Sequence, residues 1–213
     1  MKQNDHIETL NDIRKMMQRS SRFLSLSGLS GVFAGLYALG GALIAHFWIQ
    51  EIIEKYFREP DFFNKTYLDI YYLKFFSLAF IVLASSIVTG LILSSRKAKK
   101  AGQPLFDYGA KLLLTNLAIP LFSGGAFCLL LLLRGELALI APAMLVFYGI
   151  SLLAAGKYTL DEVRYLGICE VIVGLLNGFF FLGEGLLFWA IGFGVLHIVY
   201  GLVMWNKYDR VKK

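Results

Sequence analysis

Charged residues are scarce in this chain of 213 residues. Asp, Glu, Lys and Arg make up 17% of it, whereas hydrophobic residues make up 57% and the mean hydropathy is +0.63. Soluble domains carry about 25% charged and about 45–50% apolar residues, so a soluble fold of this size would expose too much apolar surface to water. The shortage of charge excludes a soluble domain and favours an integral membrane protein.

Cysteine and histidine are also rare. Both cysteines, Cys128 and Cys169, lie in apolar runs, at about 25 Å and about 8 Å from the predicted inner interface by helical rise. This separation disfavours a disulfide, so we interpret them as small apolar fillers. His46 and His197 fall at different depths, which argues against axial ligation of one haem, while His6 belongs to a polar segment.

Sequence motifs of enzymes are missing as well. The chain has no H-E-x-x-H, nucleophile elbow or P-loop, and one Glu with one His makes a poor metal site. We therefore predict no catalytic residues, no metal and no cofactor, with a lipid-modifying enzyme as an alternative. No cleavable signal is evident in the polar first 22 residues, so the first apolar run is expected to stay in the protein.

Long apolar runs, in contrast, are abundant. A helix needs about 20 residues to cross roughly 30 Å of hydrocarbon, and such runs satisfy their own backbone hydrogen bonds only as helices. We therefore predict an all-α polytopic membrane protein, a six-transmembrane-helix bundle whose last four helices form two hairpins closed at 134–136 and 182–185. The predicted spans are 23–49, 75–93, 112–133, 137–156, 165–182 and 186–205.

The net charge of +6 follows the predicted topology. Six spans place both termini on one side, and 16 of the 21 Lys and Arg residues fall on that side. The positive-inside rule then predicts cytoplasmic termini. The lipid bilayer is the expected surrounding, and the basic charge requires no nucleic acid as a partner.

The chain divides into three predicted segments. Residues 1–22 show apolar positions three and four apart and predict an amphipathic helix, lying on the inner leaflet or docking a protein partner. Residues 23–205 form the transmembrane domain, and 206–213 form a basic cytoplasmic tail.

Small residues recur at four-residue spacing in the first span. Ser27, Gly31 and Gly35 lie on one face, and in the last span Gly194 and Gly201 share a face with His197. Such faces let helix backbones approach closely. They predict helix packing, either within the bundle or across a homodimer.

An acidic residue, Glu170, interrupts the apolar fifth span. It lies 14 residues from the turn at Gly183–Glu184, and His197 lies 13 residues from it on the other side. Antiparallel helices that run straight into this turn bring the two side chains to the same depth. Because an acid facing lipid costs about 2.5–3.5 kcal/mol, we expect Glu170 to face His197 inside the bundle.

Three further polar residues, Asn116, Ser151 and Asn177, are predicted to join this pair in one intramembrane polar patch. The patch has two interpretations. In the first, it fixes the register of the helices; in the second, it binds or relays a proton, a cation or a polar solute. The protonation of Glu170 and His197 is left open.

The stretches "RSSRFLSLSGLSGVFAGLYAL" and "GFGVLHIVYGLVMWNKYDR" resemble a group of short uncharacterised inner-membrane proteins of Bacteroides-type bacteria. The resemblance implies a bacterial inner membrane and no catalytic residues. Our first functional hypothesis is a non-enzymatic accessory, regulatory or scaffolding protein that acts through its basic surface. The alternative is a small proton- or cation-coupled transporter that uses Glu170 and His197.

Overall fold

The computed structural model describes residues 22–58, 65–102 and 104–210. The predicted amphipathic helix therefore lies outside the described residues, apart from Arg22. Six helical segments are each long and apolar enough to cross a membrane, and the described part of the chain contains no strand. The predicted fold class, an all-α bundle with six spans, is confirmed.

The first, second, third and fifth spans are single helices, and the fourth and sixth combine several helical segments. The first three are α2 (Gly28–Arg58), α3 (Lys65–Lys100) and α4 (Tyr108–Leu133). The fourth span consists of η2 (Leu137–Leu139), α5 (Ile140–Ala155) and η3 (Gly156–Tyr158), and the fifth is α6 (Asp161–Phe180). The sixth runs through η4 (Leu182–Glu184), α7 (Gly185–Trp189), η5 (Ala190–Leu196), α8 (His197–Met204) and η6 (Trp205–Asp209).

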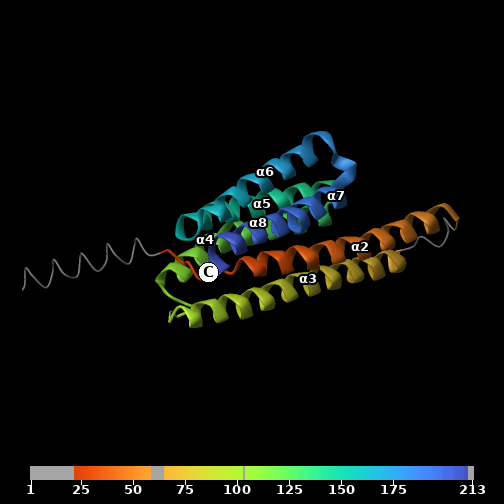
Figure 1. Cartoon of the computed structure of the whole chain (residues 1–213). Coiled ribbons are helices and arrows are strands. Elements are labelled where there is room, and N and C mark those ends of the chain that lie inside the picture. The colour runs from red at the N-terminus through yellow and green to blue at the C-terminus, as the bar shows by residue number, and fades with distance from the viewer. Residues whose placement is uncertain (1–21, 59–64, 103, 211–213) are drawn as a thin grey trace, which may run out of the picture.

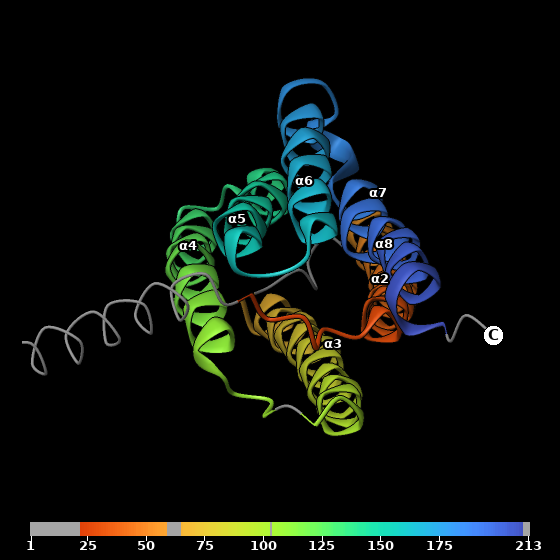
Figure 2. The same ribbon diagram turned by 60° about the vertical axis from the view of Figure 1, so that its left-hand side comes forward.

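The helices form a curved row when viewed along the bundle, in the order α3, α2, the sixth span, α6, α5 and α4 (Figure 2). The most extensive packing joins α5 to α6 and α4 to α5, followed by α2 with α8, whereas α3 packs extensively only against α2 among the described elements. The α2–α3 hairpin extends beyond the other helices at one end (Figure 1). This matches helix lengths of about 47 Å and about 54 Å at 1.5 Å per residue.

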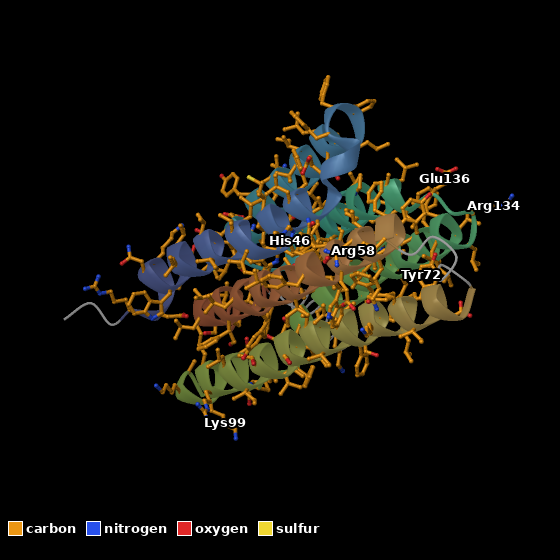
Figure 3. All side chains as sticks on the ribbon, turned by 90° about the vertical axis from the view of Figure 1, so that its right-hand side faces the viewer. His46, Arg58, Tyr72, Lys99, Arg134 and Glu136 are labelled. Carbon is orange, nitrogen blue, oxygen red and sulfur yellow. The ribbon has the colours of Figure 1, made fainter. Side chains whose placement is uncertain are left out.

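Basic residues gather at one end of the bundle, which we call the basic end. It comprises residues 22–27, 94–102, 156–162 and 205–210. Figure 3 shows Lys99 at this end, and Arg134 and Glu136 at the opposite end, where Gly135 turns the chain with a φ of 79°. The beginning of α2 and the end of the sixth span lie together at the basic end, because a Cβ on Gly28 would come within 2.7 Å of the Gly201 carbonyl oxygen.

The first and last predicted boundaries need correction. The first helix begins at Gly28, five residues later than predicted, because residues 22–27 run extended across the basic end. Within them, the Phe23 N–H donates to the Tyr158 carbonyl oxygen at 2.7 Å. The last helix continues to Asp209, so residues 206–209 belong to the bundle and not to a separate tail.

The carboxylate of Asp209 explains both corrections. It accepts a hydrogen bond from the Gly28 N–H at 2.7 Å and thereby caps the start of α2, and it pairs with the Lys97 ammonium of α3 at 2.6 Å. An anion suits the N-terminus of a helix because the first N–H groups lack partners within the helix. Asp209 of the sixth span thus contacts both α2 and α3 and links the three.

Glycines form the seam between α2 and the sixth span. A Cβ on Gly31 would lie 3.1 Å from the Cα of Gly201, and one on Gly35 would lie 2.5 Å from the Gly194 carbonyl oxygen. The predicted small-residue faces therefore pack against each other within the bundle. Ser27 precedes the helix, where its carbonyl oxygen accepts from the Ser30 N–H at 3.2 Å.

Candidate intramembrane polar site

Glu170 lies at the centre of the bundle. It is the tenth of the 20 residues of α6, and none of its side chain is exposed. Its carboxyl group packs against Gly192 of the sixth span, where an added Cβ would approach Glu170 Oε2 to 2.5 Å. Glycine at position 192 therefore makes room for the acid.

His197 faces Glu170 from the sixth span, as expected from their matched distances to the turn. Its Nδ1 lies 3.4 Å from Glu170 Oε1 and 3.0 Å from the Gly192 carbonyl oxygen. A carbonyl oxygen can only accept, so Nδ1 carries a proton in this arrangement. That N–H donates to the Gly192 carbonyl oxygen on its own span, and the Glu170 carboxyl group of α6 lies beside it without a hydrogen bond of normal geometry.

Tyr148 of α5 completes the contacts of the imidazole. Its hydroxyl lies 2.8 Å from His197 Nε2, and the two rings stack with centroids 5.5 Å apart. With the ring neutral and Nδ1 protonated, the tyrosine O–H donates to Nε2. If Nε2 gains a proton, the same hydroxyl oxygen can accept it. The site can therefore hold one proton more or less without moving its heavy atoms.

The π-helix η5 shapes this part of the sixth span. It covers Ala190–Leu196 and ends directly before His197, whose ring bonds the carbonyl five residues earlier. Single-turn π segments in helices occur frequently at functional sites. The straight sixth helix assumed from sequence is wrong in this detail.

The Glu170 carboxyl group lacks hydrogen-bond donors in the part of the chain that the structure describes. Among the described residues, neither of its oxygens has a hydrogen-bond partner, although His197 Nδ1 lies 3.4 Å from Oε1. A charged carboxylate without donors is costly in a membrane interior. The group therefore depends on His197 or on a proton of its own.

The other predicted members of the patch each donate to a backbone carbonyl oxygen four residues away in the chain. Asn177 is fully buried but sits seven residues along α6, and its amide donates to the Phe181 carbonyl oxygen at 2.6 Å, at the end of the helix. Ser151 and Asn116 bond carbonyl oxygens four residues earlier on their own helices, at 2.7 and 2.8 Å. We therefore define the polar site as Glu170, His197, Tyr148 and Gly192.

Sequence reasoning missed Tyr148 and Gly192 as site residues. The spacing of Gly192 and Gly194 just before an intramembrane histidine is the signal that indicates irregular backbone there. Tyr148 carried no comparable signal, because one tyrosine in an apolar helix looks like any core aromatic residue.

The remaining candidates do not approach the site. His46 on α2 is exposed and contacts the Phe47 ring, and both cysteines are unpaired thiols. Within the described ranges, no three His, Cys, Asp or Glu residues are grouped as a metal would need.

Two cavities stand out in the structure, and both lie away from the polar site. One, of ≈ 380 Å³, is an apolar recess between α4, α5 and α6 that includes Phe127, Pro142 and Gly174. The other, of ≈ 470 Å³, opens at the basic end beside Arg22, Lys157 and Arg164. Neither is lined by Glu170, His197 or Tyr148.

Comparisons with known proteins add no relative. No family model matches the chain, and neither a curated protein nor a solved structure matches it.

Proposed function

We propose that this polytopic membrane protein is a non-enzymatic accessory, regulatory or scaffolding protein. In this proposal the bundle holds a fixed shape and its basic end binds a membrane or cytoplasmic protein partner. The observation that carries it is the contrast between a buried, tightly packed polar site and an exposed basic end. Glu170 has no exposed surface, whereas Lys99, Lys100 and Arg96 are solvent-accessible.

The proposal includes an orientation and a location. Residues 22 and 210, the two ends of the described chain, both lie at the basic end. A fusion to the C-terminus therefore reports the side of the membrane on which both ends lie. We propose that this end is cytoplasmic and that the membrane is a bacterial inner membrane, in keeping with the positive-inside rule and the resemblance stated above. A C-terminal green fluorescent protein should then fluoresce, and a C-terminal alkaline phosphatase should be inactive. The reverse pattern would refute the orientation.

The scaffold role is tested by quantitative purification from native membranes. The tagged full-length protein should bring down one partner at constant stoichiometry. Substitution K99Q/K100Q at the basic end should reduce that stoichiometry at least about threefold, whereas K55Q/R58Q at the opposite end should not. Equal recovery of the partner with both variants, or no stoichiometric partner, would contradict the proposal.

A second function, proton- or cation-coupled transport, is favoured by one observation. The buried Glu170 oxygens lack hydrogen-bond partners in the described structure and face an imidazole that can exchange a proton. Purified protein in liposomes with an imposed pH gradient should then show a flux that E170Q abolishes while the variant stays folded. A purely structural site predicts no flux in either protein and reduced stability in the variant.

A further inference from the structure

The cavity at the basic end lies where the extended segment 22–27 passes between two helix ends. Its volume is ≈ 470 Å³, and its walls come from the end of α5, the connection to α6 and the first turns of α6. The lining residues are Arg22, Leu153, Gly156, Lys157, Asp161 and Arg164.

Hydrogen bonds fix the wall formed by the extended segment. The Thr159 hydroxyl, fully buried, donates to the Phe23 carbonyl oxygen at 2.7 Å, and the Phe23 N–H donates to the Tyr158 carbonyl oxygen at the same distance. These bonds attach the residue after Arg22 to the loop that carries Lys157. The cavity is therefore a built feature of the folded chain.

Positive charge dominates the lining. Arg22, Lys157 and Arg164 face one acid, Asp161. Within the described ranges, Asp161 pairs only with Arg22, at 3.4 Å, and the Arg22 and Asp161 side chains are more than half exposed, at 53% and 68%. Such exposed pairs are weak and exchange readily. Lys157 and Arg164 form no ion pair with any residue in the described part of the chain.

The neighbouring acid is engaged elsewhere. Glu162 receives a hydrogen bond from Lys207, and the Tyr208 hydroxyl lies 3.1 Å from its oxygens. It therefore does not neutralise the cavity. The residue before Lys157, Gly156, packs closely against Arg164: a Cβ on Gly156 would lie 3.2 Å from the Cβ of Arg164.

The first turn of α6 forms one wall of the cavity and contributes Asp161 and Arg164 to the lining. It also carries two acids, Asp161 and Glu162, which suit the positive end of the helix dipole. The attraction for an anion therefore comes from the basic side chains and not from the helix end.

We propose that this cavity binds a phosphate group, held by Arg164 and Lys157 with Arg22 at the rim. Arginine and lysine form charge-assisted hydrogen bonds to phosphate oxygens. The phosphate belongs to an anionic lipid headgroup or to a free phosphate compound, two sources with the same recognition chemistry. Basic pockets between membrane helices bind lipid headgroups in this manner, and Leu153 gives the cavity an apolar wall. The proposal does not depend on the scaffold role, because it needs no protein partner.

The test uses the purified full-length protein in detergent. Native mass spectrometry and intrinsic fluorescence titration measure binding of dioctanoyl phosphatidylglycerol, with dioctanoyl phosphatidylcholine as the zwitterionic control and inorganic phosphate as the free-anion probe. We expect K157Q/R164Q to weaken binding of the anionic probe at least about tenfold. The control K55Q/R58Q removes the same charge from the end of α2, far from the cavity, and should change affinity less than about twofold.

The outcomes separate the sources. If phosphatidylglycerol binds saturably, inorganic phosphate does not bind, and K157Q/R164Q removes the binding, the source is a lipid headgroup. If inorganic phosphate binds and competes with the lipid, the source is the free anion. Equal affinity for phosphatidylcholine, absence of binding by either anion, or equal losses in the two charge variants overturns the proposal. Thermal unfolding of both variants checks that they are folded, and K157Q alone serves as the milder variant if K157Q/R164Q is not.

Discussion

The two faces of α2 make contacts of very different character. One face presents Gly28, Gly31 and Gly35 to the backbone of the sixth span, and the other meets α3 through Gly41, where an added Cβ would lie 2.8 Å from a methyl group of Val82. In the apolar 18-residue stretch of α3 that qualifies it as a span, no residue is buried. In the corresponding stretch of α6, 33% of the residues are buried. The framework of the bundle is thus α2 with spans four to six, and α3 lies at its edge.

This difference shows how helices associate in a membrane. Lipid tails are as apolar as leucine side chains, so burying apolar side chains between helices gives little driving force for association. Close packing of helix backbones and polar contacts between helices drive association instead. The glycine seam and the polar site lie along the same sixth span. The apolar side chains of α3 gain little by leaving lipid, which leaves this helix with one main neighbour.

The glycine seam carries the largest expected effect. Gly201→Leu would drive its side chain into backbone atoms of α2, because a Cβ there already lies 2.7 Å from the Gly28 carbonyl oxygen. Backbone cannot move aside as a side chain can, so we expect a loss of at least about 3 kcal/mol in the free energy of unfolding. SDS titration followed by the fluorescence of Trp189 and Trp205 measures it.

The matched control for the seam is Gly40→Leu. Gly40 lies on α2, the helix against which Gly201 packs, but an added Cβ there would have no heavy atom within 4 Å. This variant should unfold at the same SDS concentration as the parent. Equal destabilisation by both substitutions would mean that helix propensity, and not close approach, sets the effect.

Substitutions in the polar site should cause the second-largest loss in the free energy of unfolding. His197→Ala removes the imidazole that contacts both Tyr148 and Glu170 and takes away the ion-pair partner of the acid. Interhelical hydrogen bonds in membranes contribute about 0.6 kcal/mol on average and about 1.7 kcal/mol at most, so we expect a loss of about 1.5 kcal/mol. Exposed His46→Ala, also on a membrane helix, should change the stability by less than about 0.5 kcal/mol.

A double-mutant cycle between Tyr148→Phe and His197→Ala refines this result. If the hydroxyl acts through the imidazole, the losses should be non-additive, with a coupling of about 0.5–1 kcal/mol. Additive losses would show that the 2.8 Å contact contributes nothing to stability.

The carboxylate at the basic end should have a smaller but measurable effect. Asp209→Asn weakens the cap on Gly28 and the pair with Lys97, so we expect a loss of about 1 kcal/mol. Asp161→Asn removes an acid from the same end whose pair with Arg22 is exposed, and should cost less than about 0.5 kcal/mol. If Asp161→Asn lowered the thermal stability more than Asp209→Asn, Asp161 and not Asp209 would be the acid that stabilises this end of the bundle.

Much of the framework could be predicted from sequence because its causes are local or follow from counting. Apolar runs define the spans, and residues at four-residue spacing define the glycine faces. Equal distances from one turn bring Glu170 and His197 to the same depth. Each of these steps needs only helical geometry and a short hairpin.

The missing parts depend on tertiary contacts. The π-helix of the sixth span and the room that Gly192 leaves for Glu170 follow from packing against α6. The start of α2 at Gly28 depends on Asp209, which is 181 residues away in the chain. Asn116 and Ser151 were assigned to the patch by depth alone, which does not determine the direction in which a helix side chain points.

The contact between α2 and α3 offers the smallest effect and the sharpest test of the difference between the two faces. The Tyr37 hydroxyl lies 3.1 Å from Thr89 Oγ1, a polar contact between these helices. Thr89→Val keeps the shape of the side chain and removes the hydroxyl, and we expect a loss of about 0.6 kcal/mol. Ser123→Ala removes a hydroxyl that bonds only its own helix, so it should change nothing measurable in the same SDS titration. A loss of about 2 kcal/mol in Thr89→Val would show that α3 belongs to the framework, since a helix at the edge cannot transmit so large an effect through one hydroxyl.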